Sequence, residues 1–515
     1  MAMRRNSRIV SVQAPIGGWN VRDPLPSMGP QYAPILDNVL CLPSELQVRK
    51  GWTTWATFTG TAETVFDYNG QSGTPKLYAC VNNAGAVSIY DVTNNGAVGA
   101  AKKTGLTNGF FKNAQCSTSG GNFLYLVNGT DAPILHDGTN WYSVTGVSAP
   151  YAITGVTTTD LRDVILHKRR LWFVQKNSMK CWYLPTDQIA GAAVEYDFAP
   201  IFKMGGHITK IDTWSLDAGY GLDDYFVVFA STGEVAVYRG TDPATASTWS
   251  LTGVFYIGSP VGEGYTVKYG GDLLIINRDG MAQMSKSLMS SRVSTLLQMT
   301  DKIQPQLTSD TTTYASNTGW EVFLYPTENM LIVNIPVSTT ISYQYVMNTI
   351  SGAWSRWTNI PARSWHFSNE RIYFGANGYV GRAWDGQSDN GAYINAEILP
   401  AYQNYGAQSM LKRWSMVRIV IGATGAVNYG SRMEIDFNLN PNDINVPTTV
   451  DFSSAVYGTG TYGDAKYGGA ITIQSKWASA SGIGYWGSFH CKVQTKSSDV
   501  RIYSFDINVE AGGNI

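Results

Sequence analysis

Charged residues are scarce in this 515-residue chain, at 15% of the total against roughly 25% in an average soluble protein. The formal net charge is only −1. Affinity for nucleic acid comes largely from Lys and Arg side chains that displace counterions around phosphates, so this composition argues against tight DNA binding. It permits DNA as a passing polymer, because a conduit must not hold what it transmits. A polar, weakly charged surface also suits a protein that neighbours shelter in an assembly.

Cysteine and histidine are also rare, with five residues of each type. The cysteines are odd in number, far apart and never in a Cys-x-x-Cys pair, which argues against a disulfide framework and a zinc site. The histidines lack metal-ligand spacing such as His-Glu-x-x-His. We therefore expect reduced, buried thiols, structural histidines and no metal or cofactor. The residues are Cys41, Cys80, Cys116, Cys181 and Cys491, and His136, His167, His207, His366 and His490.

Long apolar runs are missing as well. No stretch approaches the roughly 18 apolar residues of a membrane helix. The N-terminus carries Arg4, Arg5 and Arg8 but no apolar region of the kind found in signal peptides. We expect the protein to be made and folded in a cytosol, without a membrane segment.

What the chain does have is a repeated pair of short apolar runs joined by a polar turn. Propeller blades need roughly 40 to 50 residues for four strands, and the repeats return at intervals of 41 to 58 residues. This rhythm predicts an all-β fold, a β-propeller with six to seven blades. The first runs begin at Leu77, Leu124, Leu171, Phe226, Leu273, Leu331 and Ile372.

The turns between the paired runs support the same interpretation. Asn128-Gly129, Asp279-Gly280 and Asn377-Gly378 supply the positive φ that tight hairpins require. The unit at Leu331 is the weakest, because Pro336 interrupts it and proline belongs at a strand end or a bulge. Since one unit could belong to a second domain, six blades remain an alternative to seven.

Changes in pattern divide the chain into three parts. Residues 1–60 are rich in proline and glycine and are predicted to form an extended segment that packs on the rest. Residues 61–392 are the predicted propeller. Residues 393–515 contain longer β runs without the earlier rhythm, which predicts an additional C-terminal β-rich platform domain.

Two short helices are expected within this β framework. One is a helical turn between Pro30 and Leu42. The other is Ser287–Ile303, whose apolar residues follow helical spacing between two blades and which Pro305 would end. Both are interpreted as packing elements.

Three motifs have a possible chemical role, but the sequence around each of them argues against that role. Gly458-x-Gly460-x-x-Gly463 matches a dinucleotide fingerprint, but a strand and not a helix is expected after it. Asp137-Gly138-Thr139-Asn140-Trp141 is only a scrambled, unrepeated form of the turn found in sialidase-type propellers. Asp223-Asp224 lies beside glycines and is interpreted as a turn. We therefore predict no enzyme activity and no catalytic, cofactor-binding or metal-binding residue.

A series of motifs resembles the tail nozzle proteins of short-tailed bacteriophages, also called tail tubular protein B-like or phage stabilisation proteins. Their order over several hundred residues, not any single motif, carries the resemblance, which covers most of residues 15–420. The motifs are 17–20, 36–38, 48–51, 163–173, 180–185, 202–206, 211–214, 231–238, 240–243, 270–274, 371–375 and 385–391.

The resemblance implies a structural virion protein, without enzyme activity, of the viral tail. Members of that family form a ring, usually of about six copies, that lines the DNA exit channel below portal and adaptor and supports tail fibres. It implies as partners other copies of the chain, the adaptor (head-to-tail connector) protein and tail fibre proteins, with the genome passing through unbound during DNA ejection. The alternative is a glycan-binding or glycan-cleaving propeller that engages the host cell surface. A generic propeller scaffold without a viral role is a third possibility.

Overall fold

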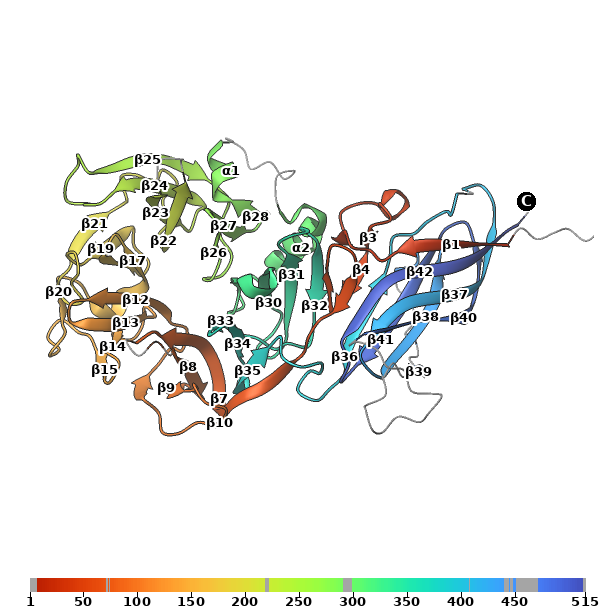
Figure 1. Ribbon diagram of the computed structural model, residues 1–515. Helices are drawn as coiled ribbons and strands as arrows, with labels where there is room; N and C mark the ends of the chain where they lie inside the picture. The colour runs from red at the N-terminus through yellow and green to blue at the C-terminus, as the bar shows by residue number, and fades with distance from the viewer. Residues whose placement is uncertain are drawn as a thin grey trace, which may run out of the picture.

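Two β structures lie side by side in the computed structural model, a propeller and a C-terminal β domain (Figure 1). The structure describes residues 7–70, 73, 75–217, 222–289, 299–406, 408–439, 444, 448–450 and 471–512. The predicted fold class, an all-β propeller with a further C-terminal β domain, is confirmed. In the described part of the chain, no helix is long and apolar enough to span a membrane.

Seven antiparallel blades surround the propeller axis within the described residues. Figure 1 shows them arranged in a ring. From the axis outward, their strands are β7 (Trp52–Tyr68, second half), β8 (Lys76–Asn83), β9 (Ala86–Asp91) and β11 (Lys103–Leu106) in blade 1; β12 (Lys112–Thr118), β13 (Gly121–Val127), β14 (Ile134–His136) and β15 (Trp141–Ser143) in blade 2; β17 (Leu161–His167), β18 (Arg170–Gln175), β19 (Lys180–Tyr183) and β21 (Val194–Asp197) in blade 3; and β22 (Ile208–Asp217), β23 (Leu222–Ala230), β24 (Glu234–Gly240) and β25 (Trp249–Tyr256) in blade 4.

The last three blades differ in how they are completed. Blade 5 has three strands followed by helix α1, and the sheet of blade 6 continues into the C-terminal domain. Their strands are β26 (Thr266–Tyr269), β27 (Asp272–Asn277) and β28 (Gly280–Gln283), then α1 (Met284–Met289); β29 (Glu321–Tyr325), β30 (Met330–Pro336), β31 (Ser342–Asn348) and β32 (Trp354–Trp357); and β33 (Ser364–Ser368), β34 (Arg371–Gly375) and β35 (Asn377–Ala383) with the first half of β7. Short pairs are made by β10 (Gly96–Ala97) with β7 and by β16 (Ile153–Thr154) with β20 (Gly191–Ala192).

Each of the seven predicted hairpins forms the second and third strands of one blade. These second strands read as continuous apolar runs because neighbouring blades cover both of their faces; every residue of β30, for example, is buried. Pro336 is the last residue of β30, where its missing N–H removes little of the hydrogen bonding between strands.

The long strand β7 closes the ring. Trp52 to Thr57 pair with β35 and complete blade 7, whereas Thr61 to Tyr68 pair with β8 and begin blade 1. The strand bends at Gly60, where φ is +111° and a Cβ would lie 2.5 Å from the Asn82 carbonyl oxygen. Strand β7 therefore belongs to two blades. It runs across residue 60, the predicted boundary between the first two parts of the chain.

The C-terminal domain consists of two packed sheets, and both include strands from the first fifty residues. One has the order β40-β37-β42-β6-β5, with β1 also paired to β42; the other continues blade 6 in the order β32-β4-β36-β41-β38-β39. The strands are β1 (Ser7–Gln13), β4 (Ile35–Asp37), β5 (Val39–Cys41), β6 (Leu46–Val48), β36 (Ile394–Leu399), β37 (Lys412–Ala423), β38 (Val427–Ile435), β39 (Thr448–Val450), β40 (Thr472–Gly484), β41 (Gly487–Thr495) and β42 (Val500–Ala511), beside the small pair β2 (Gly18–Trp19) and β3 (Tyr32–Ala33).

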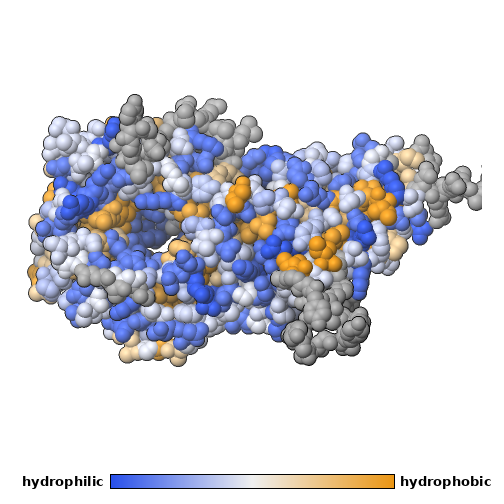
Figure 2. All heavy atoms as spheres, in the orientation of Figure 1, coloured by the Kyte–Doolittle hydropathy of each residue, from blue (hydrophilic) through white to orange (hydrophobic). Residues whose placement is uncertain are grey.

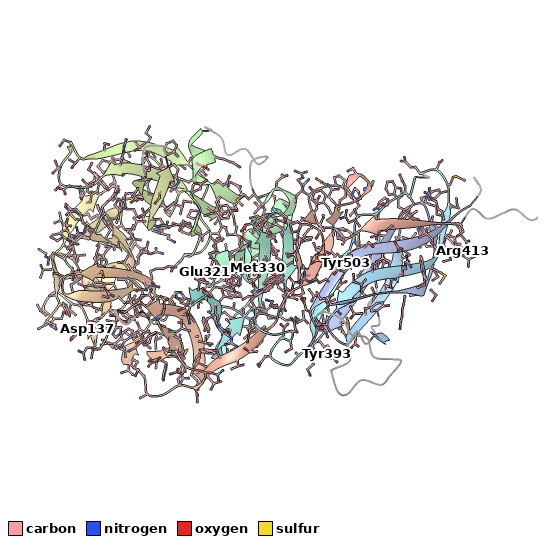
Figure 3. All side chains as sticks on the ribbon, in the orientation of Figure 1. Asp137, Glu321, Met330, Tyr393, Arg413 and Tyr503 are labelled. Atoms are coloured by element: carbon pink, nitrogen blue, oxygen red, sulfur yellow. The ribbon has the colours of Figure 1, made fainter. Side chains whose placement is uncertain are left out.

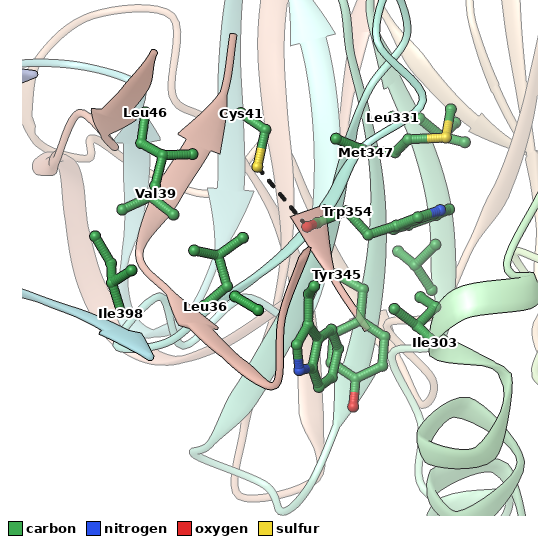
Figure 4. Close-up of a cluster of buried hydrophobic side chains, with 14 of the residues drawn as sticks. Leu36, Val39, Cys41, Leu46, Ile303, Leu331, Tyr345, Met347, Trp354 and Ile398 are labelled. Atoms are coloured by element: carbon green, nitrogen blue, oxygen red, sulfur yellow. Dashed lines mark hydrogen bonds between the residues drawn. The ribbon is translucent and has the colours of Figure 1, made fainter. Parts of the chain in front are cut away.

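One continuous hydrophobic core joins the propeller to the C-terminal domain. Figure 4 shows its centre, where Leu36 and Val39 lie between Tyr345 of blade 6 and Ile398 of β36. The thiol of Cys41 lies 3.9 Å from the Trp354 carbonyl oxygen in the same cluster. The N-terminal strands therefore pack between the propeller and the C-terminal domain.

The helix predictions need correction. Strands β3, β4 and β5 replace the helical turn expected between Pro30 and Leu42, because each of these segments has a neighbouring strand to pair with. Pro305 does not end a helix: it lies in the first turn of α2 (Gln304–Tyr314), where its missing N–H is not needed. Residues 290–298 of the predicted helix lie outside the described residues. The 3₁₀ turns are η1 (Leu25–Ser27), η2 (Thr158–Asp160), η4 (Asp301–Ile303) and η5 (Pro326–Glu328).

Candidate functional site

The first strands of the seven blades enclose a cavity of about 680 Å³ on the propeller axis. Figure 2 shows a hollow at the centre of the propeller face, with hydrophilic residues on its rim. Its lining contains four Lys or Arg side chains and five Asp or Glu side chains. These charges lie on the first strands or beside them, because only those strands reach the axis.

Acidic side chains of the cavity wall connect neighbouring blades at four places in the ring. Glu63 of β7 accepts a hydrogen bond from the Gly109 N–H at 3.1 Å, just before blade 2. Asp163 of β17 accepts one from the Ile211 N–H of blade 4 at 3.1 Å. The acids are therefore satisfied across blade boundaries, as buried acceptors must be.

The same relationship recurs on the other side of the ring. Asp212 of β22 accepts a hydrogen bond from the Thr266 hydroxyl at 2.6 Å, and Glu321 of β29 accepts one from the Trp365 N–H at 2.8 Å. Figure 3 shows Glu321 on the inner side of the ring. Burial raises the pKa of Glu321, and hydrogen bonding to Trp365 opposes that rise.

The basic side chains of the wall differ in their partners. The Arg363 guanidinium donates to the Thr339 carbonyl oxygen and to the Thr318 hydroxyl, both at 3.0 Å. Arg162 forms an ion pair with Glu263 at 3.1 Å, and Lys210 lies 3.8 Å from Asp212. Among the described residues, the Lys112 ammonium has no hydrogen-bond or ion-pair partner. Burial lowers the pKa of Lys112, and the nearby Lys210 ammonium lowers it further.

Aromatic residues, which could line a sugar site, include Phe110, Phe111, Trp320 and Trp365 on this wall, but others pack between blades. Trp172 of blade 3 contacts Phe226 of blade 4 with ring centroids 4.5 Å apart. Tyr125 of blade 2 contacts Phe173 of blade 3 at 5.7 Å. A glycosidase also needs a free pair of carboxyl groups, whereas the wall acids described above hold neighbouring blades.

The sequence motifs with a possible chemical role lie apart from one another. Asp137 is in a turn at the outer side of blade 2, far from Glu321 in Figure 3, where its carboxylate accepts the N–H groups of Thr139 and Asn140 at 2.8 and 2.7 Å. Asp224 accepts hydrogen bonds from Ser215 at 2.6 Å and from Lys168 at 3.2 Å. Residues 458–463, with the glycine fingerprint, lie outside the described residues.

Two of the five histidines, His207 and His366, line the axial cavity, and the other three lie elsewhere. His136 stacks on Trp141, and His167 contacts Phe226. His490 lies between Glu434 and Glu397 in the C-terminal domain, at 3.1 and 2.9 Å. In the described part of the chain, no group of three or more His, Cys, Asp or Glu is placed to hold a metal ion. The five cysteines are buried and unpaired.

The wall charges were missed by sequence reasoning. Their signal is a single acid or base in the first strand of a blade, ahead of the apolar hairpin, as with Asp163 before Leu171. In the sequence, such a residue cannot be distinguished from an ordinary exposed position of an amphipathic strand. Only ring closure shows that such positions from all seven blades converge.

A second site lies where the propeller meets the C-terminal domain. Arg49 donates to both carboxylate oxygens of Asp389 at 2.7 and 2.6 Å, and to the Thr358 carbonyl oxygen at 2.7 Å. Arg356 of β32 makes a similar two-bond contact with Asp37 of β4 at 2.8 and 2.6 Å. Such two-pronged contacts fix the relative orientation of the groups as well as their distance.

Comparison with known proteins gives neither a family nor a relative. No family model matches the chain, and no curated protein matches its sequence. Among solved structures, BBS1N in complex with ARL6DN is similar with 13% identity over 66% of this chain and 99% of that one, at a TM-score of 0.42. The Cps50 (Swd1) β-propeller domain of Myceliophteria thermophila is similar with 11% identity over 65% of this chain and 99% of that one, at a TM-score of 0.39. YCF48 bound to D1 peptide is similar with 9% identity over 69% of this chain and 96% of that one, at a TM-score of 0.34. Similarities this low carry no inference about what the chain binds.

Proposed function

We propose that the chain is a structural, non-enzymatic virion protein: a tail nozzle of a short-tailed bacteriophage, made in the host cytoplasm and incorporated in the tail. Several copies form a ring that lines the DNA exit channel, below an adaptor and beside tail fibres. The ordered sequence motifs that resemble the nozzle family support this proposal. The genome passes through the channel without sequence-specific contact, as the near-zero net charge permits.

The observation that carries the proposal is the rigid connection of propeller and C-terminal domain. One nine-stranded sheet runs from blade 6 through β4 into the C-terminal domain. The buried Arg49–Asp389 pair and the half-buried Arg356–Asp37 pair hold the connection on both sides of the N-terminal strands. A wall under pressure needs a building block that does not bend at a hinge, and a continuous sheet with a shared core has none.

An exposed face of the C-terminal domain supports assembly into a ring. Ile9, Asn508, Met416 and Ser479 are successive cross-strand partners, so their side chains share one face of the sheet. Ile9 is 62% exposed and Met416 41% exposed.

The edge strand β40 extends the same face. Ile473 and Ile483 alternate in phase with Ser479, and they are 60% and 66% exposed. Figure 2 shows hydrophobic residues on the visible side of this domain. Exposed apolar groups on a sheet face, here beside the Arg418–Asp506 ion pair, favour contact with another protein surface, here a neighbouring copy.

Assembly in the presence of the adaptor tests the proposal. Electron microscopy of the mixture is expected to show closed rings of about six copies, since head-to-tail contacts between identical chains close a ring. A chain that stays monomeric with its adaptor and releases sugar from host envelope would favour the glycan-cleaving alternative instead.

A further inference from the structure

The outer edges of the propeller blades differ in how they are protected. A strand at the edge of a sheet exposes unpaired backbone groups, which natural proteins protect with short strands, charged side chains or covering segments. The outer strands β11, β15 and β21 have only three or four residues. In blade 5 the Met281 N–H of the outer strand β28 donates to the Thr300 hydroxyl. The outer strands of blades 6 and 7 pair with β4 and β10.

Strand β25 of blade 4 has none of these protections. It contains eight residues, none of them charged, and β24 is its only partner strand within the described residues. Leu251 is 41% exposed and Tyr256 is 56% exposed. A bulge at Thr252 places both side chains on one face of the strand, because their cross-strand partners Tyr238 and Glu234 are four residues apart. The outer edge of blade 4 is therefore long, uncharged and apolar.

Exposed Met204 extends this apolar edge. Its side chain is 57% exposed, and its backbone N–H donates to the Glu234 carboxylate at 2.8 Å. Since Glu234 is also the cross-strand partner of Tyr256, Met204 lies beside the end of β25. Exposed apolar groups that gather at one place on a surface indicate a contact with another protein.

The C-terminal domain has an edge strand of the same kind. Strand β40 contains thirteen residues, of which only Lys476 is charged, and β37 is its one partner strand in the part of the chain that the structure describes. Ile473 and Ile483 are exposed near its two ends. Figure 1 shows β25 on the outer side of the propeller and β40 on the outer side of the C-terminal domain. One chain cannot bring these two edges together, whereas two copies can.

We propose that β25 of one copy lies against β40 of the next copy in the ring, so that Leu251 and Tyr256 are covered by the surface that carries Ile473 and Ile483. This inference rests on the proposed function, because it names the surface that the contact face meets on a neighbouring copy. Strand β40 is long enough to cover all of β25. The two strands belong to different parts of the chain, so the contact is head-to-tail, the kind that closes a ring.

Cysteine cross-linking in rings formed with the adaptor tests this inference. Thr252→Cys protein is mixed with Ser475→Cys, Ser479→Cys or Ser481→Cys protein, because these exposed positions of β40 cover different alignments of the two strands. The native cysteines are buried and do not compete. We expect a disulfide between copies for at least one mixture. Thr252→Cys protein alone is expected to give none, since a head-to-tail contact keeps two copies of β25 apart.

A charge on the edge of β25 gives an independent measurement. Leu251→Lys is expected to weaken ring assembly at least about tenfold, because the contact would bury an unpaired ammonium. Leu166→Lys is the matched control: Leu166 is also 41% exposed but lies on β17, the first strand of blade 3. This control is expected to assemble like the wild type. Equal assembly by Leu251→Lys and the wild type would contradict the contact.

The outcomes separate this inference from the proposed function. Wild-type rings in which no mixture forms a cross-link between β25 and β40 would overturn the inference alone. A wild-type chain that forms no ring with its adaptor would overturn the inference and the proposed function together.

Discussion

Arg49 and Asp389 form a buried ion pair with two hydrogen bonds, 340 residues apart in sequence, with side chains 0% and 4% exposed. Arg49 follows strand β6 of the C-terminal domain, and Asp389 follows blade 7. The pair therefore ties together the two ends of the propeller and the start of the C-terminal domain. In the absence of either partner, the other would be a buried charge without compensation.

Arg49→Met is expected to lower the free energy of unfolding by about 3–5 kcal/mol, because it leaves the Asp389 carboxylate unpaired in the interior. Urea denaturation followed by tryptophan fluorescence measures this change. Lys180→Met, which removes one partner of the exposed Lys180–Glu195 pair at 2.9 Å, is the control and should cost less than about 1 kcal/mol. Equal losses in the two variants would show that the buried pair does not hold the junction.

Gly51→Ala probes the packing at the same junction. A Cβ on Gly51 would lie 1.8 Å from the backbone carbonyl oxygen of Ser388, which cannot move without breaking the turn around Asp389. We expect a loss of about 3 kcal/mol or more in the free energy of unfolding. Gly99→Ala, where a Cβ meets nothing within 4 Å, should be nearly neutral. Differential scanning calorimetry of both variants makes the comparison, and a neutral Gly51→Ala would contradict the close approach.

Asp131 links the first two blades in a pH-dependent way. Burial would raise the pKa of its carboxyl, but hydrogen bonds from Thr107, Asn128 and Asn108 outweigh burial and lower it. A carboxyl whose folded pKa is depressed contributes stability above its unfolded pKa, near 3.9, and that contribution disappears as the pH falls through the folded value.

Asp131→Asn is therefore expected to cost about 1 kcal/mol at pH 7, since the site is partly exposed, and progressively less below about pH 4. Urea denaturation of both proteins at several pH values measures the difference. A cost that grows toward low pH would contradict the sign of the pKa shift.

Replacing both Ile473 and Ile483 with aspartate tests the proposed contact face. Charge on this face should prevent ring assembly by desolvation and like-charge repulsion across each contact, while the free energy of unfolding changes little because both side chains are exposed. Val147→Asp alters a 93% exposed residue of the propeller and is expected to leave assembly intact. Sedimentation of each variant with the adaptor distinguishes the cases; rings formed by the double variant would place the contact elsewhere.

The propeller was predictable from sequence because its second and third strands are buried on both faces. Runs such as Leu124 to Val127 are apolar throughout and end in turns that specify hairpins. The first strands carry isolated charges such as Glu63 and Asp212 and resemble surface segments, so neither they nor the cavity they enclose could be recognised.

The junction escaped prediction for a different reason. Strand β4 pairs with β32 and β36, which lie more than 300 residues away. The sequence around β4 alone does not identify such distant partners. Proline and glycine around Ile35 favour a turn, but tertiary pairing overrides that local preference. Strand β38 ends at Ile435, because Asp436 and Phe437 adopt positive φ.

The most direct test of the proposed function is a cryo-electron microscopy reconstruction of the assembled tail that contains this chain. The account predicts a closed ring in which propeller and C-terminal domain keep the relative orientation seen in the single chain, around a bore wider than the roughly 20 Å of duplex DNA. Copies in which the two parts have rotated about the Arg49–Asp389 junction, or a chain found outside the channel wall, would contradict it.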